Sequence, residues 1–240
     1  MKHKRNDLLH TMVSLGAVLL ALRLRLYIVA VDEKNLLVSG HMLSWLIWAV
    51  TAAALILAVT AALRTKETDT LPVSSPVAAL GDGLFAIAIA ITVFAMGTPA
   101  SVLEKVRMAA GYLCVPCLGY AAFCRAKGKP VFFGCFAVVC VFFALYLVSC
   151  YRLWSSNPQL QDYVFAMLTC AAVTIFAYQS AALAAGIGSK CLWLAAGMLT
   201  VAFGIAAVCQ AENGLLYMAA AGWALTGLLK YDAGTEPGEN

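Results

Sequence analysis

Charged residues are scarce in this chain of 240 residues. Asp, Glu, Lys and Arg make up 12% of it and hydrophobic residues 63%, whereas a soluble domain has about a quarter charged and about half apolar residues. This composition excludes a water-soluble globule, a disordered chain and a collagen. The net charge of +4 comes from basic residues scattered between long apolar runs, so no nucleic-acid partner is expected.

Histidine and enzyme motifs are also scarce. The three histidines stand at positions 3, 10 and 41, too few for a four-ligand zinc site of histidines. Gly-x-Ser-x-Gly, His-Glu-x-x-His and a phosphate-binding loop do not occur in the sequence. The sequence therefore predicts no catalytic residues, no metal site and no cofactor, and it favours a protein that is not an enzyme.

Long apolar runs dominate what is present. A bilayer core about 30 Å thick requires roughly 20 apolar residues in a helix. Runs of about this length cover residues 8–22 with a continuation over 24–31, 42–63, 77–97, 107–124, 131–151, 163–186, 191–209 and 214–230. The predicted fold is an all-α, polytopic bundle of about eight transmembrane helices. Residues 1–231 form its single domain, and residues 232–240 are expected to be a disordered cytoplasmic tail.

The distribution of Lys and Arg predicts the orientation of the bundle. With the N-terminus inside, the inner set is Lys2, Lys4, Arg5, Arg64, Lys66, Arg125, Lys127, Lys129, Lys190 and Lys230, and the outer set is Arg23, Arg25, Lys34, Lys105, Arg107 and Arg152. Because positive charge accumulates in cytoplasmic loops, both termini are expected in the cytoplasm. The expected location is the cytoplasmic membrane of a bacterium. The expected partners are membrane lipids, and another membrane subunit is left open as a further partner.

The first apolar run also allows a second interpretation. Lys2, Lys4 and Arg5 before an apolar stretch are typical of a secretory signal peptide. A small-x-small cleavage site does not follow the run, so the segment is expected to remain. Cleavage would leave seven spans and an outer N-terminus.

Two stretches carry a resemblance to known proteins. Val31-Asp-Glu-Lys-Asn-Leu-Leu-Val38 and Trp154-Ser-Ser-Asn-Pro-Gln-Leu-Gln-Asp-Tyr-Val-Phe165, which runs on to Ala177-Tyr-Gln179, resemble a group of bacterial multi-pass membrane proteins to which no activity is attached. This resemblance implies a membrane location and no site residues.

A third stretch, Ala79-Leu-Gly-Asp-Gly-Leu-Phe-Ala-Ile-Ala-Ile-Ala-Ile-Thr92, resembles the first-helix motif of a family of small bacterial and lysosomal potassium channels. In that family a Phe-Ser-Asp triplet precedes Gly. Here Leu80-Gly81 replaces the Phe-Ser pair, the upstream Arg is missing, and the segment is the third span. Channel function is therefore kept as an alternative.

Asp82 is the acid placed well inside a predicted span, about 7.5 Å past Val77 at about 1.5 Å per residue. An acid at such a depth is a functional candidate. A stripe of small residues at four-residue spacing includes it: Ala78, Asp82, Ala86 and Ala90. The carboxylate is therefore expected to point toward a neighbouring helix and to be the ion- or proton-coupling residue of a transporter.

The neighbours of Asp82 leave two interpretations open. Gly81 and Gly83 flank it, and a loosened backbone there would free carbonyls for a cation or proton site, as in broken transporter helices. Alternatively, Asp82 lies at an irregular helix end and is hydrated or paired with Arg64 or Lys66.

Cys114-Val-Pro-Cys117 has the spacing of a thiol-disulfide redox motif. The competing interpretation is helix packing, because small side chains recur along the same span, at Ala110, Cys114, Cys117, Ala121 and Cys124. Packing is favoured, since this span contains no His, and no Lys beside the cysteines, to stabilise a thiolate.

Four further polar residues are candidates. Tyr178 and Gln179 either bond to another helix or line a substrate cavity. Arg23 and Arg25 either extend to the outer membrane surface or hold an anion or lipid headgroup there, together with outer basic residues such as Arg107.

The function predicted from these residues is small-molecule or ion transport, or the role of a membrane-embedded accessory subunit. The alternatives are a membrane thiol-disulfide oxidoreductase using Cys114 and Cys117, a potassium-channel-like protein, and a structural protein that binds partners in the membrane.

Overall fold

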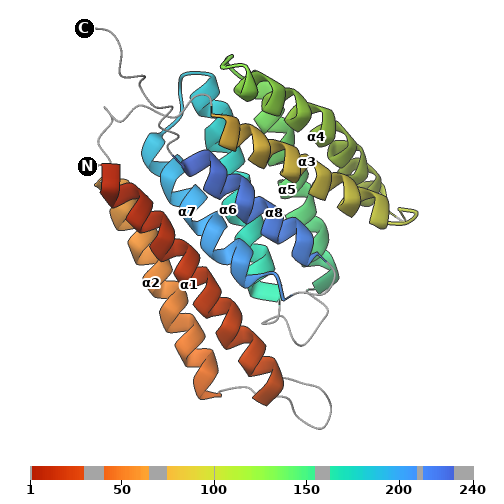
Figure 1. The fold of residues 1–240 in the computed structure, drawn as a ribbon. Helices are drawn as coiled ribbons and strands as arrows, with labels where there is room; N and C mark the ends of the chain where they lie inside the picture. Colours follow the sequence, from red (N-terminus) through yellow and green to blue (C-terminus); the bar gives the residue numbers. More distant parts are fainter. Residues whose placement is uncertain are drawn as a thin grey trace, which may run out of the picture.

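The computed structural model describes residues 2–29, 41–64, 75–99, 101–154, 163–209 and 213–229, with side chains described from Asp7 onward except at 153 and 154. These parts of the chain contain eight α-helices and no strand, and Figure 1 shows how the helices are arranged. The helices are α1 (Lys2–Val29), α2 (Met42–Leu63), α3 (Pro76–Ala95), α4 (Val102–Ala126), α5 (Phe133–Trp154), α6 (Val164–Ala184), α7 (Lys190–Ala206) and α8 (Gly214–Leu228).

The all-α prediction is confirmed, and each helix overlaps a predicted apolar segment, although α1 begins at Lys2 and α4 at Val102, ahead of the predicted starts at 8 and 107. The expected tail at 232–240 and the stretch 31–38 lie outside the described residues.

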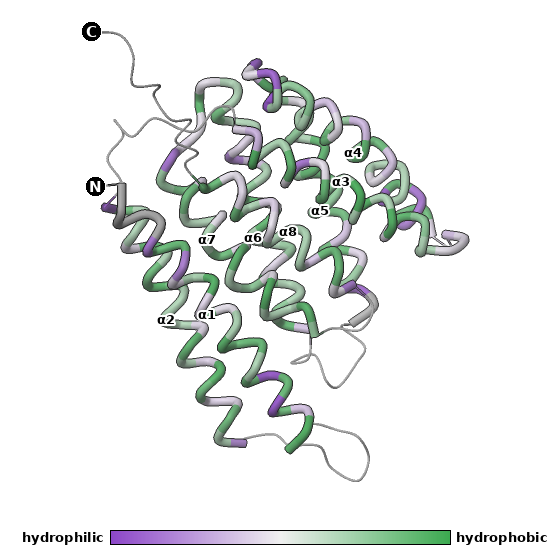
Figure 2. Tube along the Cα trace, in the orientation of Figure 1, coloured by the Kyte–Doolittle hydropathy of each residue, from purple (hydrophilic) through white to green (hydrophobic). Residues whose placement is uncertain are grey.

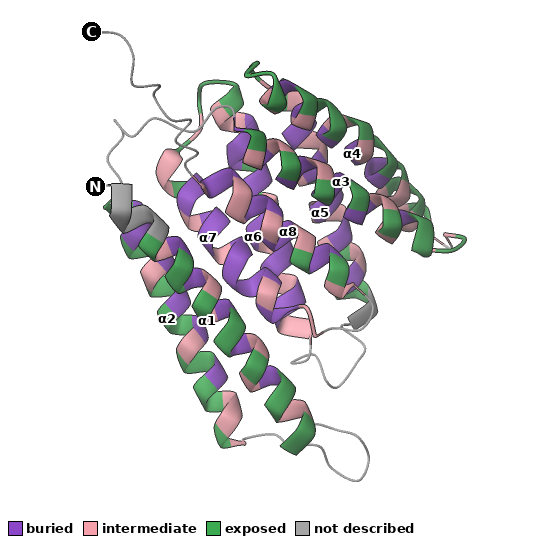
Figure 3. Ribbon diagram, viewed as in Figure 1, coloured by how far each residue is buried: buried purple, intermediate pink, exposed green. Residues whose placement is uncertain are grey.

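Helices α1 to α6 are long and apolar enough to cross a membrane, and Figure 2 shows mainly apolar residues along α2 and α3 and hydrophilic residues near both ends of α1. Helices α7 and α8 have 17 and 15 residues, which correspond to about 25 and 22 Å. Both are largely buried among the other helices (Figure 3). The chain is a multi-pass membrane protein; the count of eight spans and the orientation stay predictions.

Side-chain caps set the start of α3 and α4. Ser75 accepts hydrogen bonds from the amides of Val77 and Ala78, and Pro76 occupies the first turn of α3. In α4, Ser101 and Glu104 form a reciprocal capping box. Such caps satisfy amides that have no partner within the helix, and they fix where the helix begins.

Helices α3 to α8 form a closed ring of neighbours. Each packs on the next in chain order, and α8 packs back on α3. The pair α1 and α2 lies outside this ring against α7 (Figure 1). Because successive helices run in opposite directions, the start of α3, the end of α4 and the end of α8 lie at one end of the bundle.

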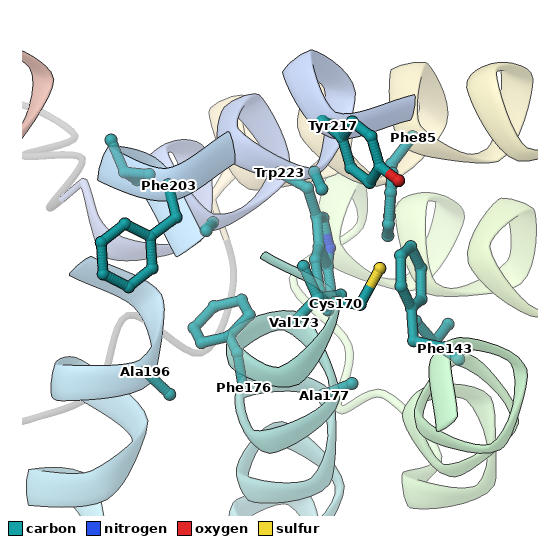
Figure 4. Packing of buried hydrophobic residues seen from close by; sticks show 14 of the residues in the cluster. Phe85, Phe143, Cys170, Val173, Phe176, Ala177, Ala196, Phe203, Tyr217 and Trp223 are labelled. Atoms are coloured by element: carbon teal, nitrogen blue, oxygen red, sulfur yellow. The ribbon is translucent and has the colours of Figure 1, made fainter. Parts of the chain in front are cut away.

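The interior of the ring is filled by aromatic side chains. Phe85, Phe143, Tyr217 and Trp223 are fully or almost fully buried, and Figure 4 shows them converging from α3, α5 and α8 around Cys170 of α6. Phe85 stacks on Trp223 with ring centroids 4.8 Å apart and on Phe143 at 5.8 Å. Aromatic contacts of this kind add to the energy of burial, and here they hold three helices together.

The predicted orientation can be tested at Lys127, which is exposed beyond the end of α4. In a variant without other accessible thiols, Lys127→Cys is expected to escape a membrane-impermeant maleimide on intact cells and to react after permeabilisation. Thr98→Cys, at an exposed site in the α3–α4 connection, is the matched control and is expected to react on intact cells. The opposite pattern would reverse the topology.

Candidate functional site

Asp82 is the centre of a polar cluster that joins three helices. Its side chain, on the second turn of α3, has 0% exposure. Its Oδ1 atom accepts a hydrogen bond from Nη1 of Arg125 at 2.9 Å and another from Nε1 of Trp223 at 2.8 Å. Arg125 belongs to the last turn of α4 and Trp223 to α8. One carboxylate oxygen thus connects α3 to both of its neighbours in the ring.

The cluster leaves two buried polar atoms without a hydrogen-bond partner among the described residues. These atoms are Oδ2 of Asp82 and Nε of Arg125. A buried ion pair is strongly favourable only when its remaining lone pairs and N–H groups are also satisfied. The Asp82–Arg125 pair therefore keeps unused capacity to bind a proton, an ion or a water molecule.

Apolar rings surround this ion pair. The guanidinium of Arg125 lies 5.0 Å from the ring centre of Phe136. Trp223 stacks on Phe85 and meets Phe176 edge to face at 4.9 Å. A charge among such groups is poorly solvated, so its interactions with its partners are stronger than in water.

The surroundings of Asp82 differ from both sequence interpretations. α3 is continuous over Pro76–Ala95, so the backbone is not broken at Gly81 and Gly83. Arg64 is exposed at the end of α2, and Lys66 lies outside the described residues. The partner of Asp82 is Arg125 instead.

In the sequence, Arg125 stands out only as a loop charge, and Trp223 does not stand out as a candidate. A signal for Arg125 was present, because Leu118, Ala121 and Arg125 follow one another at helical spacing and the first two are fully buried. Since α3 and α4 are antiparallel neighbours, the end of α4 lies beside the start of α3. No comparable signal pointed to Trp223, 141 positions away from Asp82.

Arg23 and Arg25 separate in the structure. Arg23 is 4% exposed, and its Nη1 donates to the carbonyl oxygen of Ala206 at 2.7 Å, at the end of α7. Its guanidinium also lies 4.8 Å from the ring centre of Phe165. The expected extension of Arg23 to the membrane surface is not seen, because a carbonyl at the C-terminal end of α7 offers the cation an inward partner. Arg25 is exposed.

Tyr178 and Gln179 differ in burial. Tyr178 is 58% exposed on the outside of α6, whereas Gln179 is buried. The Oε1 atom of Gln179 accepts a hydrogen bond from the backbone amide of Ser189 at 3.0 Å. Gln179 thus stabilises the connection between α6 and α7, and the structure does not bring either residue to Asp82.

The two cysteines of the redox motif lie on the packed side of α4. Cys114 is fully buried and Cys117 is half-buried, and both are free thiols. Ala110, Ala121 and Cys124 are buried as well. The placement fits a helix-packing role and leaves the redox alternative untested.

Comparisons with known proteins do not place the chain in a family. The chain matches no protein-family profile, and no curated protein or solved structure is detectably similar to it. The resemblances in the sequence therefore rest on the residues quoted for them.

Proposed function

We propose that this chain is a proton-coupled membrane transporter in which Asp82 takes up and releases the coupling proton. The observation that carries the proposal is the fully buried carboxylate whose Oδ1 is shared by Arg125 and Trp223 while its Oδ2 has no partner. Ionisable groups held inside membrane helices are costly and commonly serve as proton relays. The substrate class is a small solute or ion.

Protonation of Asp82 would change the contacts of three helices at once. The charged carboxylate attracts the guanidinium of Arg125 and accepts the indole N–H of Trp223. A protonated carboxyl group loses the charge attraction, so the links from α3 to α4 and from α3 to α8 weaken together. A transporter needs two such arrangements of its helices, with the proton favouring one of them.

A membrane-embedded accessory subunit is the second candidate function. The same two hydrogen bonds favour it, since they can serve as a permanent link between α3, α4 and α8. Under this alternative the charge of Asp82 matters for assembly and is not exchanged during a cycle.

Asp82→Asn separates these candidates, because it keeps the size of the side chain and removes its charge. The protein is reconstituted in liposomes that contain a pH-sensitive dye, and a panel of small solutes is added under an inward proton gradient. We expect solute-dependent proton uptake with the wild-type protein and none with folded Asp82→Asn. The control is Asp7→Asn, an identical change at an exposed acid of α1, which should retain the flux. Equal flux with Asp82→Asn would contradict the proposal.

Trp223 provides a second readout that needs no solute. Because its indole N–H bonds to Asp82, protonation of Asp82 should alter tryptophan fluorescence between acid and alkaline pH. The change should be absent in Asp82→Asn and in Trp223→Phe. A wild-type spectrum that does not depend on pH would favour the permanent link.

A further inference from the structure

Arg107 lies at the opposite end of the ring from Asp82, on the second turn of α4. It is half-buried. Its Nη1 donates to Oγ of Ser149 at 3.0 Å, and its Nη2 donates to the sulfur of Met96 at 3.5 Å. The guanidinium carbon lies 5.3 Å from the ring centre of Tyr146. The side chain is thus held between the end of α3, the start of α4 and the end of α5.

The partners of this guanidinium are all uncharged. Among the described residues, no carboxylate lies within ion-pair distance of Arg107. Glu104, one turn away on α4, accepts the backbone amide of Ser101 at 3.2 Å. The Nε atom of Arg107 is buried without a partner. A half-buried cation without a counter-charge is unfavourable, and it is stabilised when an anion binds to it.

The guanidinium retains donors for such an anion. It has five N–H groups, and the two bonds to Ser149 and Met96 use two of them. Its planar fork matches the oxygens of a phosphate. Lys105 and Arg152 are exposed at the same end of the bundle and add positive charge there.

The position of Arg107 suits a phosphate at the membrane interface. It lies about 8 Å from the start of α4, at about 1.5 Å per residue. Exposed apolar side chains flank it on both helices: Val106 on α4 is 48% exposed and Val148 on α5 is 50% exposed. These side chains offer a surface for an acyl chain directly beside the cation.

We propose that Arg107 binds an anionic phosphate group at this end of the bundle, as the headgroup phosphate of a phospholipid or as a free phosphate anion. This site does not depend on Asp82 or on transport. It also differs from the headgroup site expected at Arg23 and Arg25, because Arg23 is turned inward to Ala206.

Native mass spectrometry of the full-length protein in detergent tests the site. Phosphatidylglycerol is titrated against diacylglycerol with the same acyl chains, which lacks the phosphate. We expect the wild-type protein to prefer phosphatidylglycerol and Arg107→Gln to bind it about tenfold more weakly. Arg64→Gln removes an exposed arginine at the end of α2, which is not a headgroup candidate, and should leave the affinity unchanged.

Competition by inorganic phosphate shows whether the site binds a lipid headgroup or a free phosphate anion. If inorganic phosphate displaces phosphatidylglycerol from the wild-type protein, the site takes a free phosphate; if it does not, the site takes the lipid headgroup.

Should Arg107→Gln fail to fold, Arg107→Lys keeps the charge and loses the planar fork, and it should bind phosphatidylglycerol more weakly than the wild type. Unchanged binding by the folded Arg107 variant, or an equal loss in Arg64→Gln, would overturn the proposal.

Discussion

Replacing Arg125 with Met is expected to lower the free energy of unfolding by about 3 to 5 kcal/mol. The change removes the counter-charge of Asp82, which has 0% exposure, and a buried charge left without its partner is strongly destabilising. The loss should be measured by equilibrium unfolding of the purified protein in mixed micelles. Arg64→Met is the control, because Arg64 is exposed at the end of α2, and surface changes of this kind stay within about 0.5 kcal/mol.

The double variant Asp82→Asn, Arg125→Met completes the test. Without the carboxylate charge, loss of the guanidinium leaves no buried ion behind, so the double variant should be more stable than Arg125→Met alone. The difference measures the coupling between the two side chains. If the double variant loses the sum of both single losses, Asp82 and Arg125 do not act as a pair in the membrane.

The helices were predictable from the sequence because their signals are local. Apolar run length predicts a membrane helix, and serines before α3, α4 and α7 cap their first turns. The ring of α3 to α8 was not predictable, because it depends on which helices pack on one another. The hydrogen bond from Trp223 to Asp82 joins residues 141 positions apart, and nothing in either local sequence encodes it.

Tyr178 and Gln179 show why a repeat of four residues does not stay on one face of a helix. A stripe at four-residue spacing would run from Ala166 through Cys170 and Thr174 to Tyr178. An α-helix has 3.6 residues per turn, so each step of four rotates by about 40° too far, and three steps rotate by about 120°. The stripe therefore begins on the buried face at Ala166 and ends on the exposed face at Tyr178, while Gln179 is buried.

Arg23 illustrates a different limit of the sequence. Its position near the end of α1 followed from counting residues, but the direction of its side chain depends on the carbonyl of Ala206 on another helix. Likewise, Arg125 was assigned to the cytoplasmic side from its charge alone. Its contact with Asp82 arises only because α4 ends beside the start of α3. The role of a long polar side chain near a helix end thus depends on which helices pack beside it.

Gly81→Ala is expected to destabilise the bundle by about 1 to 3 kcal/mol, the usual cost of overpacking a close contact. A Cβ atom at position 81 would collide with Oγ1 of Thr226 and would lie 2.9 Å from its Cβ. Since Cβ of Thr226 is fixed by its own backbone, rotation of the side chain does not relieve this contact, and α8 must move away from α3. Trp223 lies one turn before Thr226 on α8, so this movement would also weaken its bond to Asp82.

The neighbouring glycine supplies the matched control. A Cβ atom at Gly83 would meet no atom within 4 Å, so Gly83→Ala should not lower stability and should raise it by about 0.5 to 1 kcal/mol through the higher helix propensity of alanine. Adding Thr226→Ala to Gly81→Ala removes Oγ1 and should restore part of the lost stability. Unfolding in mixed micelles gives the energies, and tryptophan fluorescence reports on Trp223. If Gly81→Ala and Gly83→Ala proved equally stable, close packing of α3 on α8 at this position would not be what holds Trp223 against Asp82.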